Sequence, residues 1–198
     1  MINVQLFTGA AVTPHLDAVA ALRIAVFRDW PYLYAGDRDY EAQYLATYAK
    51  SPDSLFVLAF DGNEVVGAST GVPLLDEVAS FRQPFIERGI DPARVFYFGE
   101  SVLLTRYRGQ RLGHRFFDER ERHAGLLGRF ETTAFCSVER PPGDSRRPDG
   151  FRLNDRFWAG RGYVRQDDML CRLEWQELGD DAPSDHALRF WLRPLEAS

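Results

Sequence analysis

Hydrophobic and polar residues alternate along residues 2–7, as they do in a half-buried β-strand. Residues 14–28 then follow the period of an amphipathic helix, for which Thr13 and Pro14 supply a cap and a first-turn proline. Residues 28–53 predict a turn followed by a second helix, which is rich in tyrosine. The sequence therefore predicts a strand and two helices as its first elements.

The rest of the chain alternates between strand-like and helix-like patterns. Apolar and alternating runs predict six strands, over residues 54–60, 64–75, 94–104, 132–138, 164–177 and 186–195. Helical periods predict three helices between them, over residues 76–89, 111–128 and 151–163. Asp61 and Gly62 form the tight turn between the first two of these strands, because Asp-Gly readily adopts positive φ angles. We therefore predict an α/β (α+β) fold with strands of mixed direction.

The composition limits the number of domains and the classes of binding partner that we expect. With 198 residues, 45% of them hydrophobic, the chain can bury one substantial core, and we predict a single domain over residues 1–198. A net charge of −5 argues against nucleic-acid binding, which requires a cationic face. The amino terminus lacks a basic-then-apolar leader, and no apolar run approaches the ~20 residues of a membrane span. We expect a cytoplasmic protein with no membrane partner.

The cysteines and histidines show no spacing that is typical of a metal site. Cys136 and Cys171 lie far apart without a C-x-x-C pattern, so we expect two reduced thiols, although a disulfide stays open at this point. The histidines at positions 15, 114, 123 and 186 are also isolated. The sequence therefore predicts no metal centre. It carries no signal for the assembly state, for which a homodimer is the commonest arrangement.

The stretch YRGQRLGHRFF, residues 107–117, joins the predicted strand at 94–104 to a helix. A glycine-rich turn at a helix start exposes unpaired backbone N–H groups, and the helix dipole adds about half a positive charge there, so the turn attracts phosphate. Arg108, Arg111 and Arg115 add full charges, although arginines at a helix start can also be simply solvated. The turn lacks the G-K-[ST] ending of a Walker A loop and the G-x-G-x-x-G spacing of a dinucleotide site.

The segment RGQRLG, residues 108–113, resembles the pyrophosphate-binding loop of the GNAT superfamily of acyl-CoA-dependent N-acyltransferases, whose pattern is [Q/R]-x-x-G-x-[G/A]. This pattern is usually seen as R-G-x-G-x-G, and the positions that match are Arg108, Gly109, Leu112 and Gly113. Arg111 stands where the family usually has a glycine. The order of the predicted elements also resembles that family over nearly the whole chain, as does FWAGRGYV at residues 157–164.

The resemblance implies a mixed, mostly antiparallel central sheet flanked by helices, with a central strand that splays from its neighbour. It implies that acetyl-CoA binds as the acyl donor with its pantetheine arm against the backbone of Ser101, Val102 and Leu103. The N–H groups implied to hold the pyrophosphate are those of Gln110, Arg111, Leu112, Gly113 and His114. The side chain of Arg108 or Arg111 would supply positive charge.

The arginine at position 111 has two interpretations. It either blocks the close approach of a phosphate or reaches over the phosphate as a clamp. We favour the clamp, because a residue in the first turn of a helix needs no positive φ and arginine is a good phosphate partner. This prediction requires a helical φ at Arg111.

In the family, the acyl group passes directly from the thioester to an amine, so a base must remove a proton from the amine nitrogen. Glu100 is the best candidate base, because it lies just before the expected pantetheine contacts. Strand alternation would place it on one face with Phe98 and Val102, where partial burial would raise its pKa. The alternative is a carboxylate that is bonded to a neighbouring arginine or to a substrate cation and moves no proton.

Many family members have a tyrosine that protonates the leaving thiolate at the position of Trp158, whose indole cannot do so. Tyr163 would be the substitute acid, although its place in GRGY is also typical of core packing. A thiol with a pKa of about 8.5 leaves fairly well without a strong acid. Trp158 is then a wall of the thioester pocket or a core residue.

Aromatic residues gather in the early part of the chain, at Trp30, Tyr32, Tyr34, Tyr40, Tyr44 and Tyr48. They would enclose an organic acceptor or pack in the core, because the last three recur every four residues. The acidic chain favours a small cationic or aromatic amine as the acceptor, and a peptide acceptor stays open. The alternative function is an acyl-CoA-binding sensor or structural domain without turnover, which Trp158 and Arg111 favour.

Overall fold

The strands of the protein form one open mixed sheet. The computed structural model describes residues 2–195, and its strands are β1 (Asn3–Thr8), β2 (Leu55–Asp61), β3 (Glu64–Pro73), β4 (Val95–Tyr97), β5 (Ser101–Leu103), β6 (Thr132–Val138), β7 (Val164–Trp175) and β8 (Ser184–Pro194). Their order is β1-β2-β3-β4-β6-β8-β7, and β5 pairs with β3. β4 and β6 run parallel, whereas the other paired strands run antiparallel. The predicted mixed, mostly antiparallel sheet is confirmed.

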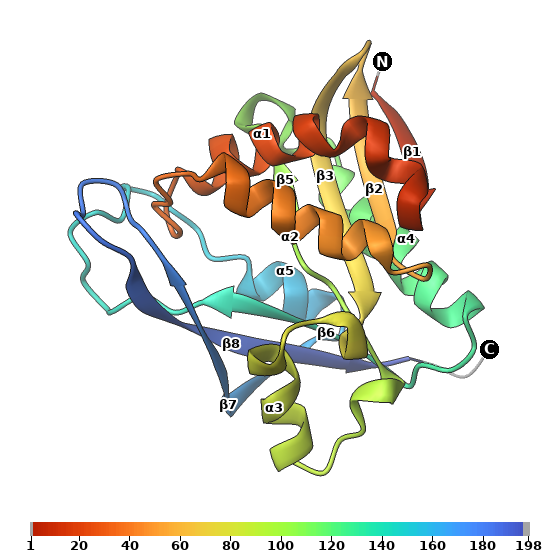
Figure 1. Cartoon of the computed structure of the whole chain (residues 1–198). Coiled ribbons are helices and arrows are strands. Elements are labelled where there is room, and N and C mark those ends of the chain that lie inside the picture. Colours follow the sequence, from red (N-terminus) through yellow and green to blue (C-terminus); the bar gives the residue numbers. More distant parts are fainter. Residues whose placement is uncertain (1, 196–198) are drawn as a thin grey trace.

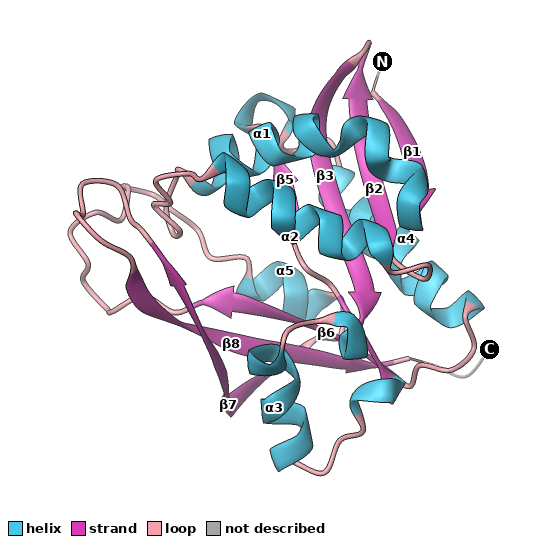
Figure 2. Ribbon diagram, viewed as in Figure 1, coloured by secondary structure: helices cyan, strands magenta, loops and turns pink. Residues whose placement is uncertain are grey.

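Helices lie on both faces of this sheet (Figures 1 and 2). They are α1 (Leu16–Phe27), α2 (Arg38–Lys50), α3 (Ala79–Glu87), α4 (Leu112–Leu126) and α5 (Asp155–Gly160). α1 and α2 cross one face of β1, β2 and β3, and α4 lies on the opposite face (Figure 1). Because helices cover both faces, β2 and β3 are buried along almost their whole length.

The first helix begins later than the sequence predicts. Thr13 and Pro14 lie in a 3₁₀ turn, η1 (Gly9–His15), and the α-helix begins at Leu16. The hydroxyl of Thr13 donates to the carbonyl of Ala10 at 2.6 Å. The residue predicted as a cap is therefore used inside the 3₁₀ turn.

One helical stretch, Gly9–Phe27, is long and apolar enough by length and composition to cross a membrane. In the structure, Val19 and Leu22 of this stretch are buried in the core, and Arg23 forms buried ion pairs. The expectation that no apolar run approaches the length of a membrane span is therefore wrong, although these contacts are those of a helix that packs against a sheet.

The sheet splits between β5 and β6. β4 pairs with β6 as far as Ala134, and the last bond of this pairing runs from Phe98 N to Ala134 O at 2.8 Å. Beyond this point β5 pairs with β3 alone, while β6 continues beside β8. The two parts of the sheet diverge, as Figure 2 shows. The splayed central strand implied by the resemblance is therefore present.

A β-bulge interrupts the central strand at the split. Gly99 N donates to Thr70 O at 3.2 Å and Thr70 N donates to Glu100 O at 3.1 Å, so two residues oppose Thr70. Phe98 consequently packs against α4, whereas Glu100 contacts Arg23 of α1. The prediction that Glu100 shares a face with Phe98 is wrong, because the extra residue reverses the alternation.

Position 99 has room only for glycine. A Cβ there would lie 2.5 Å from Tyr48 Oη and 2.6 Å from Thr70 Oγ1, which is closer than real Cβ contacts. The missing side chain lets the strand turn into the bulge beneath α2. Gly99 therefore determines where the bulge forms and which way Glu100 points.

Candidate active site

The splayed strands form two walls of a cavity of about 560 Å³. It extends from the turn before α4 to the loop between α1 and α2. Cys136 lines it, and Cys136 and Cys171 are both free thiols in this structure. The predicted site residues that line the cavity are Glu100, Ser101, Leu103, Arg108, Gly113 and Trp158. The structure therefore brings the candidate base and several expected donor contacts into one cavity.

β5 turns the backbone groups of alternate residues toward the split. The N–H of Leu104 and the carbonyl of Glu100 bond to β3 at 3.0 and 3.1 Å. Val102 lies midway between them and pairs with β3 in the same way. The N–H and C=O groups of Ser101 and Leu103 therefore face the split. This corrects the expectation for Val102, whose backbone groups are occupied by β3.

The turn before α4 exposes unpaired N–H groups. α4 begins at Leu112, and its first helical bond runs from Arg115 N to Arg111 O at 3.2 Å. The N–H groups of Leu112, Gly113 and His114 precede this bond and have no acceptor within the helix. A Cβ on Gly113 would make only ordinary contacts, so the space beside its backbone is open to a ligand.

Arg111 adopts a left-handed backbone conformation with a φ of 62°, and Gly109 has a φ of 79°. The expectation of a helical φ at position 111 is therefore wrong, because this residue caps the helix and does not lie in its first turn. The left-handed conformation costs a non-glycine residue about 1–2 kcal/mol. An arginine that keeps this conformation points to a role for its side chain.

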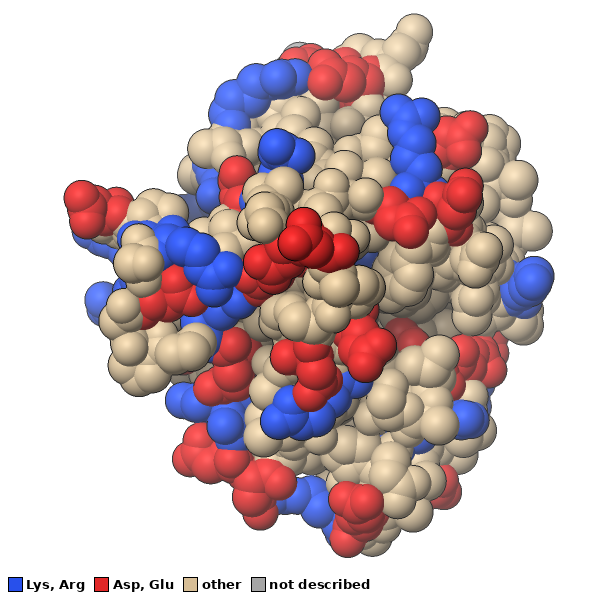
Figure 3. Space-filling model, turned by 60° about the vertical axis from the view of Figure 1, so that its left-hand side comes forward, with Lys and Arg blue, Asp and Glu red and all other residues tan. Residues whose placement is uncertain are grey.

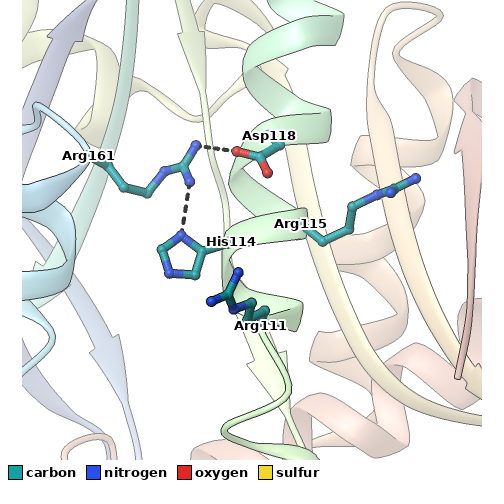
Figure 4. Close-up of a pocket in the computed structure, with 5 residues that line it drawn as sticks. All are labelled: Arg111, His114, Arg115, Asp118 and Arg161. Atoms are coloured by element: carbon teal, nitrogen blue, oxygen red, sulfur yellow. Dashed lines mark hydrogen bonds and ion pairs between the residues drawn. The ribbon is translucent and has the colours of Figure 1, made fainter.

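Basic side chains gather around this turn (Figure 4). Arg161 Nη2 donates to Asp118 Oδ1 at 2.7 Å, and its Nη1 lies 3.4 Å from His114 Nδ1. Arg108 and Arg111 form no ion pair with any residue that the structure describes. The turn therefore combines unpaired N–H groups with two uncompensated positive charges, which is the chemistry that binds a phosphate.

Glu100 lies in the cavity wall with one oxygen unpaired. The residue is 7% exposed, and Arg23 Nη1 lies 2.5 Å from its Oε2. Tyr44 Oη lies 3.4 Å from the same oxygen. Oε1 is buried and has no hydrogen-bond partner among the described residues. A buried carboxylate oxygen without a donor is unfavourable, so this oxygen is suited to an N–H group of a ligand.

Arg23 stands between two buried carboxylates, because its Nε also pairs with Glu41 of α2. Burial opposes the charge of Arg23, but the attraction of Glu100, Tyr44 and Glu41 outweighs it and raises the pKa of Arg23 well above its usual value. Burial raises the pKa of Glu41. One buried cation thus faces two buried carboxylates, and the cluster lacks one positive charge. The arginine partner left open for Glu100 by the sequence is therefore present.

The regularly spaced tyrosines of α2 pack beside this cluster. The ring of Tyr44 lies 4.4 Å from the guanidinium of Arg23, and Tyr44 Oη donates to Tyr48 Oη at 3.0 Å. Trp30 and Tyr32, by contrast, line the cavity. The aromatic segment is therefore divided between support of the charge cluster and the cavity wall.

Solved structures of similar fold are described as acetyltransferases, whereas no protein-family model and no curated protein sequence matches this chain. A GNAT-family acetyltransferase from Staphylococcus aureus Mu50 aligns with a TM-score of 0.61 and 13% identity, over 99% of this chain and 100% of its own. A ribosomal-protein-alanine N-acetyltransferase from Brucella melitensis aligns with a TM-score of 0.59 and 13% identity, over 96% and 99%. A protein from Salmonella typhimurium described as an acetyltransferase, solved with its cofactor acetyl-CoA, aligns with a TM-score of 0.55 and 10% identity, over 98% and 95%. The chain has the GNAT fold.

In this GNAT fold, the two residues considered for the leaving-group acid lie in different places. Trp158 lines the cavity and packs edge-on against Phe135 at 5.1 Å. Tyr163 is 2% exposed, lies in the core, and bonds through its hydroxyl to Thr133 at 3.0 Å and Glu121 at 3.1 Å. Burial raises the pKa of Tyr163. The structure therefore favours the core-packing alternative for Tyr163.

Sequence reasoning missed Arg120 of α4, which lines the cavity of the GNAT fold and is almost fully buried. It lies in the run DERERH, which is typical of a solvated helix face. The signal that would have found it is its spacing, because it stands four residues from both Phe116 and Ala124 on the apolar stripe. Arg23 has the same signal, because it stands four residues from the buried Val19.

Proposed function

We propose that this chain is an acyl-CoA-dependent N-acyltransferase that passes an acetyl group from acetyl-CoA directly to a primary amine. The unpaired Oε1 of Glu100 in the cavity wall is the observation that carries the proposal. It is the atom to which an amine would give its proton, in a cavity that begins at an anion-binding turn. We also propose that residues 1–198 form one catalytic domain that works in the cytoplasm.

The donor half of the cavity suits a long anionic thioester such as acetyl-CoA. The N–H groups that would hold its pyrophosphate are those of Leu112, Gly113 and His114. Arg108 and Arg111 would add charge to this contact. The carbonyl of Ser101 and the N–H and carbonyl of Leu103 would bond to the pantetheine arm as they would to a neighbouring strand. The Salmonella protein of similar fold was solved with acetyl-CoA, which supports this donor.

Glu100 would act as the base. The acceptor enters as an ammonium group and supplies the positive charge that the cluster of Arg23, Glu41 and Glu100 lacks. Oε1 of Glu100 takes one proton, and the freed nitrogen lone pair bonds to the thioester carbonyl carbon. The C–S bond then breaks, its electrons leave with the sulfur, and the nitrogen gives its second proton to water, which leaves a neutral amide. The backbone N–H of Ser101 would donate to the carbonyl oxygen as negative charge develops there.

The acceptor half favours a small amine with an apolar body. Trp30 and Tyr32 line this half, and aromatic faces attract ammonium groups. The loop at residues 28–37 is tied to the segments after β6 and β7, because Arg140 and Leu178 donate to its carbonyls at 2.6 and 2.7 Å. A small amine or a flexible peptide end would pass this loop more easily than a folded surface. Figure 3 shows acidic and basic side chains interspersed over one face of the molecule, while the net charge of −5 favours a cationic acceptor over an anionic one.

Calorimetry with CoA, together with a thiol-release assay using acetyl-CoA and a panel of amines, tests the proposal. We expect saturable CoA binding and thiol release that depends on the amine. Glu100→Gln keeps the side-chain shape but takes no proton, so it should keep CoA affinity and lower kcat by about 10²–10⁴-fold.

A well-folded protein that does not bind CoA would refute the proposal. CoA binding without thiol release for any amine would favour a sensor of the same fold instead. Trp158, which stands in place of the usual acid, supports that alternative.

A further inference from the structure

Arg120 carries a buried positive charge that no described acidic side chain contacts directly. It is 1% exposed, lines the cavity, and forms no ion pair with any of the residues 2–195. Arg23, the other buried arginine of the site, pairs with two carboxylates. Glu121, an acidic neighbour of Arg120 on the same helix, is held by Arg161 and Arg193. Arg120 is therefore a buried cation in the wall of the cavity that has no direct ion pair, although the more distant carboxylates of Glu100 and Glu121 attract its charge.

The guanidinium of Arg120 uses four of its five N–H groups within the protein. Its acceptors are the carbonyl oxygens of Phe116 at 3.2 Å, Thr70 at 3.2 Å and Glu100 at 3.1 Å, and the hydroxyl of Ser101 at 2.8 Å. The rings of Phe98 and Phe117 lie 4.2 and 4.7 Å from it. Because a guanidinium has five N–H groups, one on Nη2 has no acceptor among the described residues.

These partners solvate the charge of Arg120 without cancelling it, because the carbonyls, the hydroxyl and the rings are neutral. Burial lowers the pKa of Arg120 to about 10, so the side chain stays charged at neutral pH. In a wall of low polarity, an uncancelled cation strongly attracts a negative charge that forms beside it. The position therefore suits an anion that appears during a reaction.

The bulge separates Arg120 from the carboxylate of Glu100. The side chain of Glu100 reaches α1 and α2, whereas its carbonyl accepts from Arg120 of α4. The anion-binding turn opens α4, so a donor held there reaches the bulge along the side of Arg120. Under the proposed function, the amine would lie on the Glu100 side and the departing sulfur on the Arg120 side.

We propose that Arg120 stabilises the CoA thiolate as it leaves, in place of the acid that Trp158 cannot supply. This role rests on the acyltransferase function proposed above. The electron pair of the breaking C–S bond passes to sulfur, one proton of the ammonium group passes to Glu100, and the second proton of the nitrogen passes to water. Arg120 keeps its own protons, and the thiolate takes a proton from water after the transfer.

Tyr32 is the competing group, because it also lines the cavity and carries an O–H. Burial raises the pKa of Tyr32, and its hydroxyl lies in the field of Cys136, Arg23 and Glu100. The charges of Arg23 and the Glu100 carboxylate lie on the amine side of the bulge. Tyr32→Phe should therefore leave the dependence of the rate on the leaving group unchanged.

The first test is a titration of the CoA thiol in its complex with the protein, followed through the ultraviolet absorbance of the thiolate. We expect the pKa of the bound thiol to lie at least about one unit below that of free CoA, which is a tenfold gain in thiolate. In Arg120→Met the pKa should return to the value of free CoA. An unshifted pKa in the native protein would overturn the proposal even if the variant failed to fold.

The second test compares acetyl-CoA with acetyl-seleno-CoA, which has the same binding groups but a selenolate that leaves more easily. Arg120→Met should lower kcat with acetyl-CoA by about a hundredfold and recover most of it with the selenium donor. Arg122→Met is the matched control, because Arg122 is an exposed arginine of α4 that pairs with Glu119. This control should behave as the native protein does with both donors.

Two outcomes of the second test would overturn the role of Arg120. An equal loss of kcat with both donors would mean that Arg120 only maintains the shape of the bulge. A selective loss with acetyl-CoA in Tyr32→Phe would assign the role to Tyr32. Failure of the acyltransferase function itself would be distinct, because the native protein would then bind no CoA or release no thiol.

Discussion

Replacing Arg23 with methionine should destabilise the fold strongly, because two buried carboxylates would lose their cation. Arg23 pairs with Glu41 and lies 2.5 Å from Glu100, and its guanidinium stands 4.4 Å from the ring of Tyr44. Breaking a buried pair from one side costs about 3–5 kcal/mol. For a chain of 198 residues, we expect the Tm to fall by about 6–20 °C.

The defect in Arg23→Met should shrink at acidic pH. Burial raises the pKa of Glu41 even with Arg23 beside it, and removal of this cation raises that pKa further. A carboxyl whose pKa in the folded state is above its unfolded value of about 4.3 binds more protons when folded, so the fold gains stability as the pH falls. The difference between native protein and variant should therefore be smaller at about pH 5 than at about pH 7.5.

Urea unfolding and thermal melts at the two pH values measure this effect. Arg122→Met removes an exposed cation from α4 and is the control, with an expected loss below about 1 kcal/mol, because the buried Glu119 keeps its second partner, Arg115. A loss of that same small size in Arg23→Met, or a large loss that is equal at both pH values, would refute Arg23 as the cation of a buried charge cluster.

Three further substitutions test the bulge, the turn and the core tyrosine. Gly99→Ala should cost about 1–3 kcal/mol in unfolding free energy, because the added Cβ meets Tyr48 Oη at 2.5 Å. The same substitution should lower kcat more than it lowers CoA affinity, and a variant with native kinetics would contradict this. Arg111→Gly should raise the unfolding free energy by about 1 kcal/mol, because glycine adopts the left-handed conformation without steric cost. The same substitution should weaken CoA binding in calorimetry, and an unchanged CoA affinity would exclude a phosphate contact by Arg111. Tyr163→Phe should lower the unfolding free energy by about 0.5–1.5 kcal/mol, because the hydrogen bonds of the hydroxyl are lost. It should leave kcat unchanged in the thiol-release assay, and a hundredfold fall in kcat would instead assign Tyr163 the role of the acid.

The elements that could be predicted are those whose signals act over a few residues. The turn at residues 107–117 was found from its glycines and arginines, and the strand before it from its aromatic and branched residues. The bulge was missed because Phe98, Gly99 and Glu100 continue an ordinary strand pattern. Only Thr70, on the neighbouring strand, shows that two residues share one partner.

The charges inside the site were also missed, for a related reason. Arg23 and Arg120 stand on helices, and the groups that form ion pairs or hydrogen bonds with them lie far away in the sequence. Arg111 was misjudged by one position, since α4 begins at Leu112 and leaves Arg111 as the cap. In each case the local pattern predicts a helix correctly but does not say which charged residue is turned inward.

The bulge links the two proposed catalytic groups, and this link decides which experiment can tell their roles apart. Arg120 Nη1 bonds to the carbonyls of Thr70 and Glu100, the two residues that define the bulge. The same Glu100 presents its carboxylate on the other side of the strand. Loss of Arg120 can therefore displace Glu100 as well as remove a charge. Displacement of the base slows amine attack with either donor. Loss of the charge slows only the reaction with acetyl-CoA, because its thiolate needs more stabilisation than a selenolate does. The comparison of sulfur and selenium donors, and not the loss of activity, is what separates them.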